Sequence, residues 1–498
     1  MIKLVMNMDI IEKESLFYRK PTKTLGYLNF LNGMVTINAL PNIHKSTIRG
    51  MNRVKSSENR VKILQHELKS KARYSKDIIR FLSEMTTYFH ELKHWHEYVG
   101  TSLGYEIFRI HLEYYSRAIM ILRHIGNHQK QIKLPLKDHS FYSKATRQHY
   151  IEYKEFLKRY GELRKHKLFI VDNIFEDVRK IKTKNLKTRI LKSIPFFLDE
   201  LNMDEVILAD VPVTGISLLE ASAVLTQVFA IHDVYGLEES SLFLKRAFEA
   251  PTLWAYNSII KSMILAQSNV PLEMMQAIIS HSITYPLIAK QKNENDPIER
   301  FVIFLEELKK TVEVPQSLQE IEKWILNIYR KHFWIEPKDF LVKQINESRE
   351  LLKRHQLDLQ KTDNLTDAIE DYYAAYHSDR LYFLEKTYEN VIFWSNDYYY
   401  VENPTPHTIN LPTTYRSPVR LKKNEWNSSL RWFFSTHIVD YLISKPKEEF
   451  ICPFKGKNHC PVETETCGTL PLQMPPEHPE CEFLVTSCEI VLPNWDLI

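Results

Sequence analysis

The spacing of apolar and polar residues along the chain predicts a mainly helical protein. Apolar residues recur every three or four positions over long stretches, which is the pattern of helices with one buried face. The expected helices are 76–99, 104–124, 146–167, 216–233, 239–248, 253–266, 297–311, 317–331, 338–359, 364–391 and 424–444.

A few segments have the pattern of strands instead. Residues 23–41 contain two apolar runs separated by Asn32-Gly33, a pair that favours the tight turn of a β-hairpin. A short strand is expected at 205–209, and the proline-rich segment 402–421 is expected to be an extended loop. The predicted fold class is therefore mainly α, of the α+β type.

Changes in composition divide the chain into three predicted regions. Residues 1–75 hold the N-terminal β-hairpin and a basic segment, 76–445 form a helical domain, and 446–498 form a cysteine-rich module. We find no internal repeat and no low-complexity tract that would suggest another organisation.

Composition excludes several classes of protein. Only 11 of the 498 residues are glycine, and neither of the glycine-rich phosphate-binding motifs is present. No stretch approaches the ~18 consecutive apolar residues of a membrane-spanning helix, and the N-terminus does not resemble a signal peptide. All 5 cysteines lie near the C-terminus instead of being spread as in a disulfide-stapled protein. We therefore expect a cytoplasmic protein that is not embedded in a membrane.

Basic residues are concentrated in two segments, although the whole chain carries a formal charge of only +4. Residues 45–76 hold ten Lys or Arg against two Glu, and residues 144–192 hold fifteen against six acidic residues. Such a stripe could bind nucleic acid or another polyanion. It could equally be a set of solvated helix faces, since no known nucleic-acid-binding motif surrounds it.

The most informative motif is His-Glu-x-x-His at His90, Glu91 and His94. On a helix His90 and His94 lie one turn apart, so both imidazoles can reach one metal ion. Glu91 lies about 100° around the helix from His90, where its carboxylate could activate a water molecule. An apolar stripe on the other side of this helix predicts that the histidines face a cleft. A plain amphipathic surface helix would have the same pattern.

A third metal ligand must come from elsewhere in the chain, and Glu220 is the best candidate. It lies on an otherwise apolar predicted helix that follows a strand, beside small residues that permit close packing. A carboxylate in such a setting is costly to bury unless it is paired or binds a metal. Asp233, Glu238, Glu239 and His232 remain alternatives. A di-iron site would need a second Glu-x-x-His pair, which we do not find.

These residues give the chain a resemblance to the zincin metallopeptidases of the gluzincin type, which combine His-Glu-x-x-His with a glutamate on a later helix. The resemblance covers 86–100 and 215–224. It implies a zincin-like helical core in which His90, His94 and Glu220 hold a catalytic zinc and Glu91 is the general base. Lys93 is charged where such motifs mostly have uncharged residues, and the metzincin type is excluded because its third histidine is missing.

The C-terminal cysteines predict a second, structural zinc site. Cys452, Cys460, Cys467 and Cys481 lie within a loop-rich segment, and clustered thiolates in a reducing compartment suit a closed zinc site. His459 or His478 could replace one cysteine, and Cys488 lies among apolar residues, where it could be a small core residue.

The function expected from these features is zinc-dependent hydrolysis of peptide bonds in a peptide or protein substrate. The main alternative is a binding protein without enzymatic activity, which would use the basic stripe on nucleic acid or a protein partner. A metal-binding zincin fold without catalysis is a third reading. A tyrosine such as Tyr398 or Tyr400 could also assist the reaction, but the sequence selects neither.

Overall fold

The computed structural model describes ten segments and four isolated positions of the chain. The segments are 26–29, 34–37, 78–128, 189–197, 206–249, 254–284, 296–358, 364–389, 408–410 and 419–420, and the single positions are 66, 148, 151 and 439. Most of these residues are in helices and a few are in short strands. The prediction of a mainly α fold is confirmed for this part of the chain.

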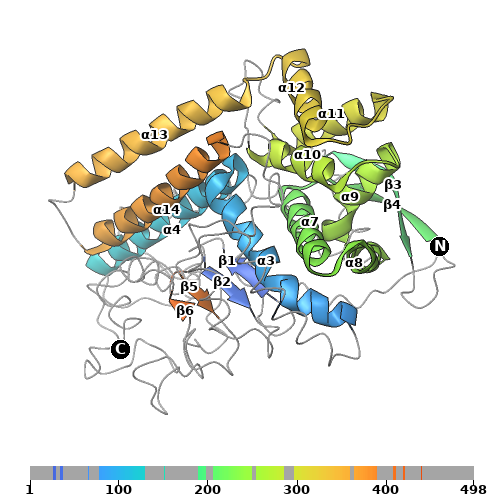
Figure 1. The fold of residues 1–498 in the computed structure, drawn as a ribbon. Coiled ribbons are helices and arrows are strands. Elements are labelled where there is room, and N and C mark those ends of the chain that lie inside the picture. Colours follow the sequence, from blue (N-terminus) through green and yellow to red (C-terminus); the bar gives the residue numbers. More distant parts are fainter. Residues whose placement is uncertain are drawn as a thin grey trace, which may run out of the picture.

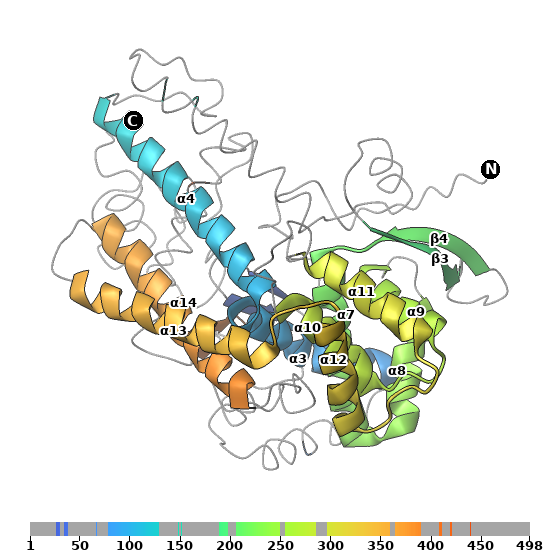
Figure 2. The same cartoon turned by 90° about the horizontal axis from the view of Figure 1, so that it is seen from above.

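Two long helices, α3 (Ile78–Gly100) and α7 (Gly215–Tyr235), pack against each other in the middle of the molecule. Figures 1 and 2 show α3 between a group formed by α7 and its neighbours and a second group that contains α4 and α14. All the side chains from 86 to 100 of α3 whose burial the structure describes are buried. This part of the helix is therefore covered on every side, and here the alternative of an amphipathic surface helix is wrong.

Helix α7 is a core helix with almost no polar face. Its N-terminus is capped by Thr214, whose hydroxyl accepts a hydrogen bond from the backbone amide of Ser217. In return, the Ser217 hydroxyl accepts a hydrogen bond from the backbone amide of Thr214. Among the described helices, only Gly215–His232 is long and apolar enough to cross a membrane, but 94% of that segment is buried inside the protein. Burial on this scale is what a central helix of a folded domain requires.

The neighbours of α7 form the first group. These are α8 (Leu237–Glu249), α9 (Trp254–Ala266) and α10 (Leu272–Thr284), which all contact α7. Strands β3 (Ile190–Phe197) and β4 (Val206–Pro212) form an antiparallel pair beside them. The strand predicted at 205–209 is confirmed, since β4 begins at 206 and continues to 212.

The sequence pattern did not predict α10 or β3. Residues 274–284 of α10 are all buried, so this helix lacks the polar face that makes a helical period visible. Strand β3 is interrupted by an irregularity in its pairing with β4 between Leu191 and Ile194, where Ser193 has a φ of 56°. The irregularity breaks the alternation of apolar and polar residues by which a strand is recognised.

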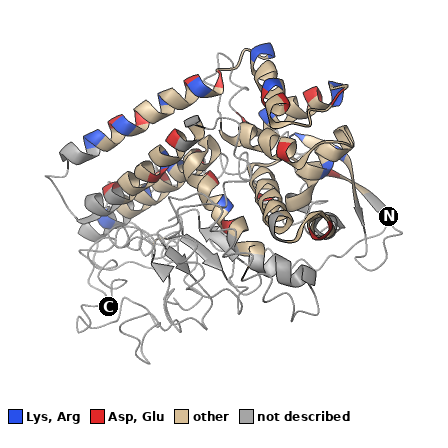
Figure 3. Ribbon diagram, viewed as in Figure 1, with Lys and Arg blue, Asp and Glu red and all other residues tan. Residues whose placement is uncertain are grey.

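The second group contains α4 (Ser102–His128), α13 (Pro337–Asp358) and α14 (Asn364–Glu389). Helices α4 and α14 both pack on α3, and α13 packs on α14. Two further helices, α11 (Pro297–Lys310) and α12 (Leu318–Lys331), cover α10. Figure 3 shows residues of both charge signs along α12 and α13. Helices α11 to α14 have the bounds that the sequence predicted to within one or two residues.

The C-terminal end of α3 is fixed by several hydrogen bonds. The Thr101 hydroxyl donates to the Glu97 carbonyl (2.6 Å) and accepts from the Gly104 amide (2.9 Å), so one side chain links the end of α3 to the start of α4. Arg380 of α14 donates to the carbonyls of Val99 and Thr101. A cation at this end is also favoured by the helix dipole. The histidine-bearing helix is therefore firmly held at the end nearest His94.

A second sheet joins distant parts of the sequence. Strands β1 (Gly26–Asn29) and β2 (Met34–Ile37) form the predicted hairpin, and both contact α3. Strand β5 (Thr408–Asn410) pairs in parallel with β2, and β6 (Val419–Arg420) pairs with β5. The segment 402–421, predicted as a loop, therefore contributes two short strands.

Several predictions concern residues that lie outside the described part of the chain. These are the cysteine-rich module at 446–498, the basic segment 45–76 except for position 66, and most of the basic segment 144–192. Tyr398 and Tyr400 also lie outside it, as does the expected helix 424–444 apart from Val439. The structural zinc site and the division into three regions stay predictions.

Candidate metal centre

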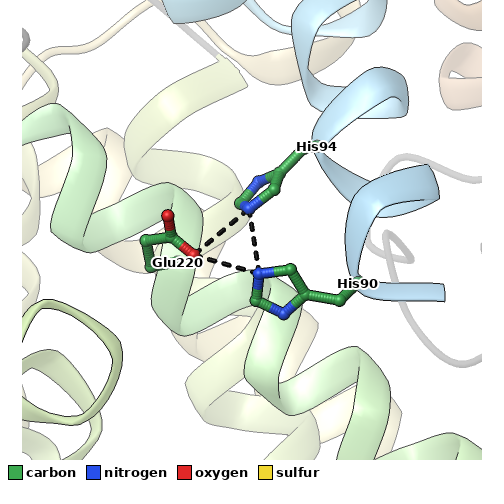
Figure 4. A group of neighbouring side chains, drawn as sticks. All are labelled: His90, His94 and Glu220. Atoms are coloured by element: carbon green, nitrogen blue, oxygen red, sulfur yellow. Dashed lines mark hydrogen bonds and ion pairs between the residues drawn. The ribbon is translucent and has the colours of Figure 1, made fainter. Parts of the chain in front are cut away.

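Three predicted metal ligands meet between α3 and α7. The Nε2 atoms of His90 and His94 are 3.1 Å apart, and both lie close to the same oxygen of Glu220. That oxygen, Oε2, is 3.0 Å from His90 Nε2 and 3.2 Å from His94 Nε2 (Figure 4). The structure therefore brings together side chains that are 126 and 130 positions apart in the sequence.

The size of this triangle suits a small metal ion. In a tetrahedral zinc site with bonds of about 2.1 Å, neighbouring ligand atoms are about 3.4 Å apart. The three separations of 3.0, 3.1 and 3.2 Å are slightly shorter, so small side-chain movements would accommodate an ion. The described residues contain one such group of potential metal ligands, namely these three residues.

The electric charge of the surroundings also favours a cation. Glu91, Glu97 and Glu220 are all buried, with exposed fractions of 4%, 0% and 5%. The buried cation beside them is Lys93, which is only 1% exposed. With neutral imidazoles these four ionised groups carry a net charge of −2, which is costly to bury unless it is compensated. A divalent metal ion would neutralise it.

The same charges shift the pKa values of the ligands in opposite directions. Burial alone would lower the pKa of His94, but the carboxylates of Glu220, Glu97 and Glu91 together outweigh it and raise that pKa to about 10. Burial alone would raise the pKa of Glu220, but His94 and His90 hold it well below its usual value. The carboxylate therefore stays ionised and available as a ligand.

Lys93, which departs from the usual motif, has a local role in the structure. Its ammonium lies 3.7 Å from Oε1 of Glu97, which is one turn further along α3. Burial lowers the pKa of Lys93, and Glu97 opposes that shift. The charged residue is therefore accommodated by an acidic neighbour on its own helix.

Helical spacing explains how α3 and α7 present these groups. Thr86, His90, His94 and Glu97 follow one another at intervals of four, four and three residues, so they lie along one side of α3. On α7, Glu220 and Gln227 are separated by seven residues, or two turns, and face α3. Helix α7 packs on this side of α3, so His90 and His94 are only 7% and 6% exposed, and the cleft expected in front of them stays a prediction.

Sequence reasoning missed three neighbours of the histidines. The Gln227 amide oxygen lies 3.0 Å from His90 Nδ1, and Glu97 Oε2 lies 3.6 Å from His94 Nδ1. The half-buried Tyr256 of α9 lies with its ring centre 5.8 Å from that of His90. The seven-residue spacing from Glu220 to Gln227, and the three-residue spacing from His94 to Glu97, could have indicated the first two. No local signal indicated Tyr256.

The alternative third ligands whose side chains the structure describes are not part of this group. His232 and Glu238 are exposed, and Glu239 lies with Glu238 in the first turn of α8. The side chain of Asp233, and the cysteines Cys452, Cys460, Cys467 and Cys481, lie outside the described residues. Glu91 is buried, and it is close enough to His94 for its charge to raise the pKa of that imidazole.

Comparisons with other proteins add no further information about the site. No protein-family model, no curated protein and no solved structure matches this chain.

Proposed function

We propose that the protein is a zinc-dependent hydrolase that cleaves peptide bonds in a peptide or protein substrate. The convergence of His90, His94 and Glu220 on one buried point supports this proposal more than any other observation. Two neutral imidazoles and one carboxylate are a common ligand set for a catalytic zinc, and they leave a fourth position for water or substrate. The proposal includes the zincin-like core and the cytoplasmic location expected from the sequence.

In this proposal each residue of the motif has a separate task. His90, His94 and Glu220 hold the ion, and bound zinc supplies Lewis-acid polarisation of the scissile carbonyl and a lowered pKa for the attacking water. Glu91 takes the proton that the water loses as its oxygen joins the carbonyl carbon. Glu91 then returns this proton to the amine nitrogen as the carbon–nitrogen bond breaks.

Metal analysis combined with a cleavage assay tests the proposal. The purified full chain should contain zinc at the α3–α7 site and should cut members of a mixed peptide library, as followed by mass spectrometry. Glu91→Gln should retain zinc and lose cleavage, because the amide cannot accept the proton. Glu113→Gln is a matched control on the exposed side of α4, where Glu113 pairs with Arg117, and it should change neither property.

Two results would contradict the proposal. Absence of zinc binding by a correctly folded chain would exclude the metal centre itself. Zinc binding without any cleavage, equal in the wild type and in Glu91→Gln, would show a metal-binding protein that is not a hydrolase. Salt-dependent binding to DNA or RNA that Glu91→Gln leaves unchanged would point to the alternative of a binding protein.

A further inference from the structure

We propose that Gln227 is a positioning residue that fixes the orientation and the protonated nitrogen of His90, so that Nε2 is free to bind a metal. This inference rests on the metal centre proposed above, but not on hydrolysis. It concerns a contact that the motif does not contain, because Gln227 comes from α7 and lies 137 positions beyond His90.

The hydrogen bonds around Gln227 determine which nitrogen of His90 carries the proton. The amide nitrogen of Gln227 donates to the hydroxyl of Thr86 over 2.9 Å. The amide oxygen is thereby turned toward His90 Nδ1, at a distance of 3.0 Å. An amide oxygen can only accept a hydrogen bond, so in this arrangement Nδ1 carries a proton, and in the neutral imidazole that binds a metal Nδ1 is the nitrogen that keeps it. The lone pair then lies on Nε2, the atom that faces Glu220.

The positions of these residues on their helices make the arrangement rigid. Gln227 lies two turns after Glu220 on α7, and Thr86 lies one turn before His90 on α3. One glutamine therefore bridges two consecutive turns of α3, while Glu220 contacts the histidines from the same side of α7. All four residues are buried, with exposed fractions between 0% and 7%. Water therefore competes little for these hydrogen bonds.

His94 has an acidic neighbour on its own helix. Its Nδ1 lies 3.6 Å from Oε2 of Glu97, an ion-pair distance that is longer than the hydrogen bond of His90 to Gln227. Each imidazole of the pair thus has an oxygen atom on its Nδ1 side and the Glu220 oxygen on its Nε2 side. Oxygen acceptors on the second nitrogen are a general feature of metal-binding histidines, and their loss weakens metal affinity by roughly 10–100-fold.

Three variants of the full chain test the assignment. Gln227→Leu keeps an apolar side chain of similar size but removes the acceptor, and we expect zinc to bind roughly 10–100-fold more weakly. Gln227→Glu keeps an oxygen acceptor and should bind zinc as tightly as the wild type or more tightly. The control is Gln276→Leu, because Gln276 is another buried glutamine that donates to Ser222 of α7 but does not contact the histidines. It should leave zinc affinity unchanged.

The affinities can be measured by competition with a chromophoric chelator, with circular dichroism as the check that each variant is folded. Cobalt(II) substitution adds a readout that a purely structural role would not alter, since its visible spectrum changes with the ligand geometry in Gln227→Leu but not in Gln276→Leu. Equal losses in Gln227→Leu and Gln227→Glu would overturn the proposal, because the amide would then be a donor to His90. Unchanged affinity in Gln227→Leu would also overturn it, while leaving the metal centre intact. A wild type that binds neither metal would remove both.

Discussion

Among the buried histidine-containing clusters in the described part of the chain, two have opposite electrostatics. At the metal centre His94 lies among the carboxylates of Glu220, Glu97 and Glu91, and its pKa is raised to about 10. In the second cluster His281 of α10 lies beside Arg300 of α11. There burial, and then the positive charge of Arg300, lower the pKa of His281 to about 3. Two equally buried imidazoles are therefore shifted in opposite directions by their neighbours.

The second cluster is a hydrogen-bonded network around Arg300. His281 Nδ1 lies 3.0 Å from the hydroxyl of Tyr329, and Arg300 donates to the carbonyl of His281 at 3.0 Å. The guanidinium also lies over the ring of Trp334, 4.7 Å from its centre. Donors and acceptors alternate here, and the aromatic faces support the cation. At the candidate metal centre, in contrast, two imidazole nitrogens and one carboxylate oxygen converge at separations of 3.0, 3.1 and 3.2 Å, an arrangement that can hold a cation.

The largest effect should come from removing the shared carboxylate of the metal centre. Glu220→Ala should weaken zinc binding by at least about 100-fold, since losing a direct ligand exceeds the loss of a hydrogen-bonded neighbour. Equilibrium competition for zinc gives this value. His281→Ala is the control in the second cluster, and it should leave zinc affinity unchanged although it is equally buried. If both variants lost affinity equally, the two clusters would not differ as we infer.

The next effect concerns stability and should arise in the second cluster. Arg300→Met keeps much of the side-chain volume but leaves the His281 carbonyl and the Tyr329 hydroxyl without this donor. We expect the free energy of unfolding to fall by about 3 kcal/mol. Urea unfolding of the metal-free protein measures the change, and zinc affinity of the folded variant should be that of the wild type. A large loss of zinc affinity without a loss of stability would contradict the division into a structural and a ligand-binding cluster.

Acid should destabilise the second cluster through His281. Its pKa is about 3 in the folded protein and about 6.5 when unfolded. The contribution of His281 to the free energy of unfolding is therefore complete above pH 6.5 and is lost as the pH falls below it. From pH 6.5 to 5 this residue should cost about 2 kcal/mol. His281→Gln should flatten the dependence of unfolding free energy on pH over that range. An unchanged slope would show that His281 is not held neutral by its surroundings.

The sequence predicted the meeting of His90, His94 and Glu220 better than it predicted the fold around them. His90, His94 and Glu220 could be found because helical spacing fixes where the two histidines point, and because a carboxylate on an apolar helix needs a partner. Gln227 and Tyr256 were missed because they approach from other helices, and only tertiary packing determines such contacts. The packing of α7 over the histidines was not predicted for a related reason, since a stripe of polar residues does not reveal whether another helix covers it.

The secondary structure shows the same limit. Amphipathic helices such as α12 were predicted closely because water on one side and core on the other give them a visible period. Helix α10 was missed because every residue from 274 to 284 is buried, so its sequence carries no such contrast. It is this helix that supplies His281 to the second cluster. A helix that the sequence did not predict therefore supplies a central residue of the second cluster.

The smallest effect on stability should come from an exposed ion pair close to Arg300. Glu299, the residue before Arg300, accepts two hydrogen bonds from Arg189, of 2.7 and 2.9 Å. The Arg189 side chain is 57% exposed, so water competes for both charges. Arg189→Ala should lower the free energy of unfolding by less than about 1 kcal/mol, and 1 M salt should reduce even this difference.

Comparison with Arg300→Met makes this small effect informative, because Arg189 contacts the residue next to Arg300 on α11. Urea unfolding at low and high salt would measure both under the same conditions. The Arg300 effect should persist in salt, since its partners are a carbonyl, a hydroxyl and aromatic rings inside the protein. If Arg189→Ala cost as much as Arg300→Met, burial would not be what separates the two pairs. The strength of each polar contact here would then have to be attributed to its geometry instead.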